Sequence, residues 1–188
     1  MSFISIPETN TTIHGVQEAD GLPYDVCNGL IAMHKDIAPK SAKVGTANGD
    51  QVVSTIRDVR AYPLTQNQAD KIIQPITDEV NETFNYDIVG LIEHPAILRY
   101  TAPSNGYDWH VDIAEGPASL RKISIIINLN DDYEGGDFEL FSEGGASRIS
   151  LERGQIIAFS SFLPHRITPV TKGERWSIVA WISGPCFR

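Results

Sequence analysis

The segment 95–112, which reads PAILRYTAPSNGYDWHVD, is the most informative part of this sequence about the fold class. Two runs of apolar and aromatic residues, 96–101 and 107–113, flank a turn that is rich in proline, serine, asparagine and glycine. Such runs between turn formers are typical of short β-strands. We therefore predict that a strand-rich region begins near residue 95.

The same pattern continues almost to the end of the chain. Further strands are predicted at 121–130, 137–141, 147–151, 155–160, 164–170 and 175–182. Regularly spaced short strands favour a two-sheet jelly roll (double-stranded β-helix) or a small barrel. The run from Ile123 to Leu129 is apolar on both faces, as expected if one face packs on helices while the other lines a cavity.

Helical patterns lie upstream of this region. Amphipathic helices are predicted over 23–36 and 66–84, and Pro75 should kink or divide the second helix. The intervening segment 37–56 is rich in turn formers, so it is either a functional lid beside the pocket mouth or a disordered loop. The expected class is mostly β with N-terminal helices.

Length and composition indicate one ordinary globular domain. The 188 residues are 41% hydrophobic and 21% charged, so we expect a single domain over 1–188. Within it, 1–94 supplies helical support and the lid loop, and 95–188 supplies the jelly-roll core. The two cysteines, Cys27 and Cys186, lack metal-site spacing and are interpreted as ordinary thiols.

The charge excludes some classes of partner. A net charge of −9 opposes nucleic-acid binding and suits a basic peptide or a small cation better. No apolar run approaches the roughly 20 residues that span a bilayer, and the N-terminus lacks a secretory pattern. We therefore expect a cytoplasmic protein without a membrane partner.

Two segments carry metal-binding chemistry. In a strand, His110 and Asp112 point to the same face, although an HxD pattern alone is common by chance. His165 follows a Leu-Pro turn farther along, and two imidazoles with one carboxylate suit iron(II) or, alternatively, the zinc of a hydrolase. Arg175 favours iron, because a guanidinium fork matches the far carboxylate of a dicarboxylic acid. Taken alone, Arg175 would be interpreted as a surface hairpin charge.

Together these motifs resemble one known family. RYTAPSNGYDWHVD at 99–112, LNDDYEGGDFEL at 129–140 and HRITPVTKGERW at 165–176 resemble the prolyl 4-hydroxylase and PKHD-type branch of the 2-oxoglutarate/iron(II) dioxygenases. The resemblance covers residues 95–183. The order and spacing of the three segments are more specific than any single motif.

The resemblance implies a role for each matching residue. His110, Asp112 and His165 would be the iron ligands, and Arg175 would bind the distal carboxylate of 2-oxoglutarate. Other co-substrate contacts and pocket-lining residues implied by the resemblance are Tyr100, Asn128, Trp181, Ile126 and Thr168.

The resemblance also implies a reaction. It is hydroxylation of a C–H bond that uses iron(II), 2-oxoglutarate and O2, with ascorbate for reactivation, and that releases succinate and carbon dioxide. The first expected substrate is a prolyl residue in a peptide or protein, followed by a lysyl residue or a free amino acid. Two alternatives stay open: a cupin-like metal hydrolase or isomerase, and a non-catalytic iron and 2-oxoglutarate sensor.

A strand register follows if His165 and Arg175 face one cavity. We predict a hairpin of strands 164–170 and 175–182 with the loop Lys172-Gly173-Glu174, because a one-residue slip would reverse every side chain. This register pairs Thr171 with Arg175 and places His165 opposite Trp181. His165, Arg175 and Trp181 should then share one inward face.

Overall fold

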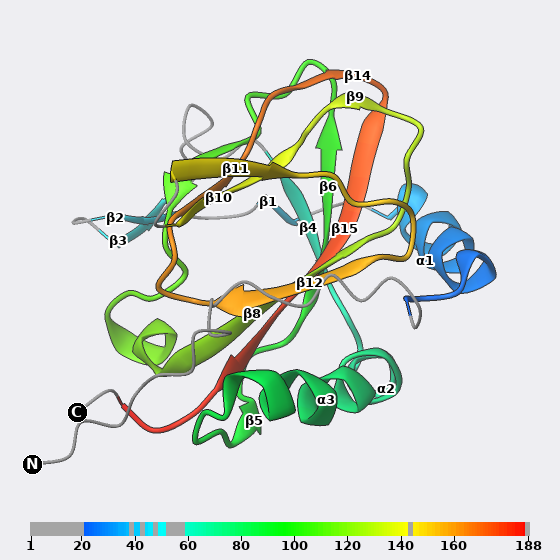
Figure 1. Ribbon diagram of the computed structural model, residues 1–188. Helices are drawn as coiled ribbons and strands as arrows, with labels where there is room; N and C mark the ends of the chain where they lie inside the picture. Colours follow the sequence, from blue (N-terminus) through cyan, green and yellow to red (C-terminus); the bar gives the residue numbers. More distant parts are fainter. Residues whose placement is uncertain are drawn as a thin grey trace, which may run out of the picture.

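The computed structural model describes residues 21–37, 59–142 and 145–186, together with the backbone of short strands at 40–41, 44–46 and 49–51 (Figure 1). The helices are α1 (Tyr24–Lys35), α2 (Gln66–Ile72), α3 (Gln74–Phe84) and the short 3₁₀ helix η1 (Gly116–Leu120). None of the helices in these ranges is both long and apolar enough to cross a membrane.

The two predicted long helices are confirmed, and the second is divided as expected. α2 begins with a capping box in which Thr65 and Gln68 satisfy each other's main-chain N–H groups. Pro75 lies in the first turn of α3, where its missing N–H would have no helical partner in any case. The proline therefore marks a helix boundary at Ile73.

A major and a minor sheet form a jelly roll, which confirms the predicted fold class (Figure 1). The major sheet has the order β1 (Lys40–Ser41), β4 (Arg60–Pro63), β6 (Ala96–Thr101), β15 (Glu174–Ser183), β8 (Arg121–Asn128) and β12 (Ile156–Ser160), with β5 (Gly90–Leu91) also pairing with β15. The minor sheet has the order β11 (Gly145–Ile149), β10 (Phe138–Ser142), β13 (His165–Ile167) and β7 (Tyr107–His110).

Two short pairs complete the strands. β9 (Glu134–Gly135) pairs with β14 (Val170–Lys172), and β2 (Val44–Thr46) pairs with β3 (Gly49–Gln51). The predicted loop 37–56 thus contains the short strands β1, β2 and β3. Its remaining residues, apart from Ile37, lie outside the described part of the chain, so its role as a lid stays a prediction.

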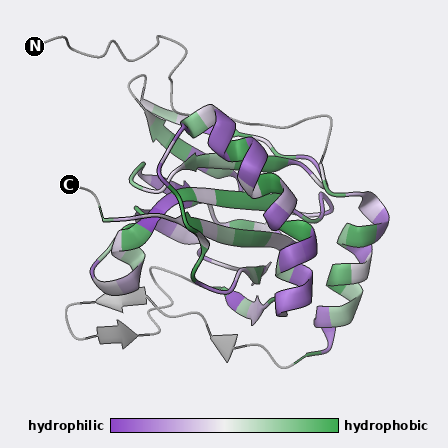
Figure 2. Cartoon of the chain, turned by 90° about the horizontal axis from the view of Figure 1, so that it is seen from below, coloured by the Kyte–Doolittle hydropathy of each residue, from purple (hydrophilic) through white to green (hydrophobic). Residues whose placement is uncertain are grey.

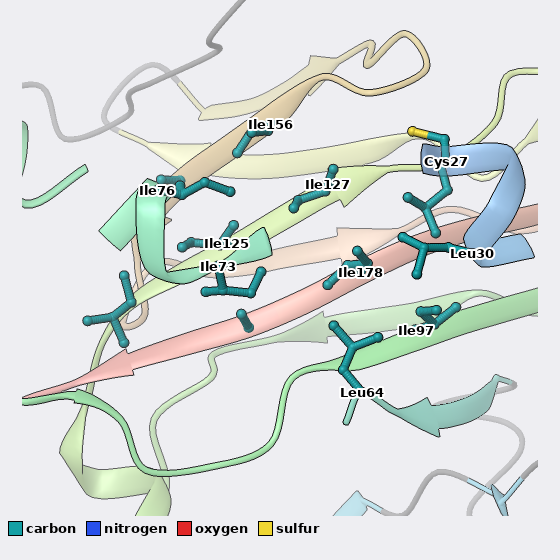
Figure 3. Packing of buried hydrophobic residues seen from close by; sticks show 14 of the residues in the cluster. Cys27, Leu30, Leu64, Ile73, Ile76, Ile97, Ile125, Ile127, Ile156 and Ile178 are labelled. Atoms are coloured by element: carbon teal, nitrogen blue, oxygen red, sulfur yellow. The ribbon is translucent and has the colours of Figure 1, made fainter. Parts of the chain in front are cut away.

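Strand β8 is buried on both faces because it separates two cores, but only one face is apolar: beside Ile126 the face toward the minor sheet carries Ser124 and Asn128, so the prediction of two apolar faces is wrong. Ile123, Ile125 and Ile127 belong to the layer beneath the helices, where Leu30 of α1 and Ile73 also pack (Figure 3). In Figure 2 the green apolar strands lie behind helical turns that are partly purple and hydrophilic, although α1 also exposes Tyr24, Val26 and Met33. This packing leaves the opposite face of the major sheet free to meet the minor sheet.

The second core lies between the two sheets. It contains Ile126 of β8 together with Phe138 and Leu140 of β10 and Phe159 of β12, all buried. Burying such side chains contributes about 1.5–3 kcal/mol each. These buried side chains therefore hold the two sheets in place relative to each other.

The predicted hairpin between 164–170 and 175–182 is wrong. β13 pairs with β10 and β7 in the minor sheet, whereas β15 pairs with β6 and β8 in the major sheet. The segment predicted as one strand is divided into β13 and β14, and Pro169, which has no N–H to donate, lies between them. The chain thus crosses from one sheet to the other instead of turning back on itself.

Candidate metal centre and co-substrate pocket

Three side chains converge between the two sheets. His110, Asp112 and His165 each offer a ligand atom, and these atoms lie within 4.8 Å of one another. His110 comes from the end of β7 and His165 from the adjacent β13, where the two residues are paired in register. Asp112 lies two residues beyond β7, so its place does not come from strand alternation alone.

Each imidazole is oriented by a main-chain carbonyl. Nδ1 of His110 lies 2.7 Å from the oxygen of Asp108, and Nδ1 of His165 lies 2.9 Å from that of Leu163. A carbonyl oxygen can only accept, so both Nδ1 atoms carry the proton. This leaves Nε2 of each ring as the atom available to a metal, and the two Nε2 atoms lie 3.8 Å and 3.4 Å from the carboxylate oxygens of Asp112.

The carboxylate of Asp112 is held in its charged form. Burial by itself raises the pKa of Asp112, but the facing His165 and His110 imidazoles and hydrogen bonds from Ser124 and Trp181 hold it below its usual value. Ser124 Oγ donates to Asp112 Oδ2 over 2.6 Å. A carboxylate beside two imidazole nitrogens is a donor set that fits iron(II).

Arg175 lies at the other end of the pocket and is 2% exposed. Its Nη1 donates to Ser177 Oγ over 2.8 Å, whereas its buried Nε has no hydrogen-bond partner. No carboxylate within the described ranges forms an ion pair with it. A buried, uncompensated guanidinium requires an anion, and the carboxylate of a co-substrate would supply one.

The surface-charge alternative for Arg175 is therefore wrong; His165, Arg175 and Trp181 do line one cavity, but from two facing sheets and not from one face. Arg175 and Trp181 of β15 line the same cavity as His165 of β13, although these strands belong to different sheets. Tyr100 and Ile126 line it as well, as the resemblance implied.

Two of the implied pocket residues require correction, because neither is among those that line the cavity. Both N–H groups of the Asn128 amide donate to main-chain oxygens, those of Asn130 at 2.7 Å and Leu151 at 2.9 Å, so none remains for a carboxylate. Thr168 lies just beyond β13, and its hydroxyl instead accepts from the main-chain N–H of Asp137.

Other cavity residues were missed by the sequence analysis. Tyr107 stacks on the His110 imidazole with ring centroids 3.5 Å apart, while Ser124 and Ser177 bond to Asp112 and Arg175. Ser177 lies on the face where strand alternation places it, two residues after Arg175, although no role was assigned to it from the sequence. Ser124 carried no comparable signal, since its partner Asp112 comes from a loop after another strand.

Gly136 lies directly against the side chain of Arg175. Its φ is +65°, and an added Cβ would lie 2.8 Å from Cδ of Arg175 and 3.0 Å from Cγ2 of Val170. We expect Gly136→Ala to lower the melting temperature by roughly 2–8 °C through backbone strain. It should also displace Arg175 and so raise the KM for 2-oxoglutarate, measured by succinate formation.

Gly116→Ala is the matched control for this prediction. Its φ is +70°, but nothing lies within 4 Å of the added Cβ, so the control carries the strain without the contact. An equal rise in KM for both variants would show that Gly136 acts only through stability.

The fold and the site together define a class of protein: a jelly roll that holds a His-Asp-His metal site and a buried arginine in one cavity. Residues 95–183 match the model of the 2OG-Fe(II) oxygenase superfamily. Over these residues the chain is similar to that superfamily, whose name states the metal and the co-substrate that the site fits.

Curated proteins resemble part of the chain in sequence. A PKHD-type hydroxylase of Synechococcus sp. (strain CC9311) is 37% identical over 91 residues, which cover 47% of this chain and 41% of the relative. The chain thus spans about two fifths of the length of such curated relatives.

Solved structures share the fold over most of the chain. A Pseudomonas putida prolyl-4-hydroxylase aligns with a TM-score of 0.66 at 19% identity, covering 87% of this chain and 89% of that one. A Trichoplax adhaerens prolyl hydroxylase, solved with a hypoxia inducible factor peptide fragment, aligns with a TM-score of 0.65 at 18% identity, covering 85% and 76%.

Proposed function

We propose that this chain is a 2-oxoglutarate- and iron(II)-dependent dioxygenase that hydroxylates a C–H bond, with a prolyl residue in a peptide or protein as substrate. The observation that carries the proposal is the pairing of a three-ligand site with a buried arginine that has no carboxylate partner among the described residues. Neither feature alone would suffice, because hydrolases also use two imidazoles and a carboxylate.

Each side chain would have a definite task. His110, Asp112 and His165 would hold iron(II) through one face, and Arg175 and Ser177 would hold the far carboxylate of 2-oxoglutarate. The buried side chains of Leu98 and Ile126 exclude water from the walls between these two ends. When bound, iron(II) supplies the activation of O2 that C–H hydroxylation requires.

The prolyl substrate is supported by the names of the similar proteins. The curated relative is a PKHD-type hydroxylase, and the aligned structures include prolyl hydroxylases, one of them with a peptide. The net charge of −9 favours a basic rather than an acidic peptide around the reacting residue.

The proposal is tested by anaerobic titration of the protein with iron(II) and 2-oxoglutarate, followed by a peptide-library screen in air. We expect a visible charge-transfer band in the first step, and succinate together with a 16 Da mass gain of proline-containing peptides in the second. Matched peptides with alanine for proline should show no gain. If metal-loaded protein shows neither the band nor 2-oxoglutarate turnover, the hydrolase or isomerase alternative is favoured.

A further inference from the structure

A second arginine lies beside the metal site and has no part in the function proposed above. Arg121, at the start of β8, donates from Nη1 to the main-chain oxygen of Asp112 over 2.9 Å. Its Nε donates to Glu93 over 2.7 Å, and Nη2 reaches the other oxygen of the same carboxylate. This two-point pair sets the plane and the direction of the guanidinium.

The face of the same guanidinium lies on a cavity wall. The central carbon of Arg121 lies 3.8 Å from the centroid of the Trp181 ring, and Trp181 lines the same cavity as Asp112. Arg121 therefore contacts both the main chain of Asp112 and an aromatic side chain of the cavity that holds its carboxylate.

Asp112 needs such support because of its place in the chain. It lies beyond the end of β7, so no sheet ladder holds its main chain. Its N–H donates to the oxygen of Ser161 over 2.9 Å, and its carbonyl accepts from Arg121. A metal ligand must be held within about 0.5 Å of its productive position, and residues outside strands and helices are held less precisely than residues within them.

We infer that Arg121, oriented by Glu93, is a positioning residue that places Asp112 for metal binding. The inference rests on the proposed function, since it concerns the same metal site. Arg121 does not line the cavity, so it acts through Asp112 and Trp181 rather than on a substrate.

The test measures cobalt(II) binding to the metal-free protein, by affinity and by the visible absorption of the bound ion. Arg121→Ala should weaken cobalt(II) binding on the order of 10-fold or more and shift the absorption bands, as expected when a partner of a metal ligand is lost. Arg121→Lys should give a smaller change in the same direction, because an ammonium lacks the planar fork. Glu93→Gln should likewise weaken binding less than Arg121→Ala.

Arg153→Ala is the matched control. Arg153 also forms an ion pair, with Asp131 at 2.6 Å, and lies over an aromatic ring, that of Tyr24 at 5.5 Å, but it does not line the metal cavity. Its loss should leave cobalt(II) affinity and absorption unchanged, even if the melting temperature falls.

The possible outcomes distinguish the proposed function from the positioning role of Arg121. If the wild-type protein binds no cobalt(II), the proposed function fails and the inference fails with it. If the wild type binds cobalt(II) while Arg121→Ala binds it equally well with the same absorption, only the inference is overturned. Equal weakening in Arg153→Ala would also overturn it, because the effect would then be one of general stability.

Discussion

Replacing His110, Asp112 or His165 with alanine is expected to abolish 2-oxoglutarate turnover while the fold remains. Each change removes one of the three atoms that lie within 4.8 Å of one another. Loss of a partner of a metal ligand already costs 10–100-fold in affinity or activity, so loss of a ligand should cost more than about 100-fold. Succinate formation and iron(II) affinity are the measurements.

The fold should survive because the cavity is built by apolar packing of the sheets and not by the metal. The buried side chains of Phe138, Leu140 and Phe159 hold this region whether or not a metal is bound. Circular dichroism and thermal melting of each metal-free variant check this point. A folded variant with wild-type turnover would remove that residue from the ligand set.

Arg175→Ala is expected to raise the KM for 2-oxoglutarate by roughly 10–150-fold, the range that corresponds to losing 1.5–3 kcal/mol of a hydrogen bond to a charged group. Metal affinity should change far less, because Arg175 lies at the opposite end of the cavity from the triad. Steady-state kinetics at varied 2-oxoglutarate, together with iron(II) titration, measure the two effects separately.

Removing a buried arginine also leaves a void, so a second variant is needed. Arg175→Lys keeps a positive charge and much of the volume but loses the planar fork, and it should give an intermediate KM. Arg148→Ala, an arginine whose side chain is 63% exposed, is the surface control and should leave KM unchanged. Equal losses of iron(II) and 2-oxoglutarate affinity in Arg175→Ala would contradict its assigned role.

Much of the architecture could be predicted from local pattern. The strand over 96–101 and the helix boundary near Pro75 are where the sequence placed them. The isoleucine-rich run at 123–129 indicated a buried strand between two cores, although Ser124 and Asn128 make one of its faces partly polar. These features depend on side-chain periodicity and on proline geometry, which act over a few residues.

The pairing of the last strands could not be predicted in this way. Adjacent strands most often pair, and Gly173 suited a tight turn, so a hairpin was the simplest reading. The chain instead places β13 and β15 in different sheets. His165 and Arg175 nevertheless line one cavity, because the inner faces of the two sheets face each other.

Local sequence is enough to predict the alternation of the strands and the two motifs that suggest His110, Asp112 and His165 as ligands. The hydrogen bonds of the Asn128 amide and the contact of Arg121 with Asp112 depend on the folded chain. Periodicity is a property of neighbours along the chain, whereas these hydrogen bonds join segments whose approach depends on the packing of both sheets.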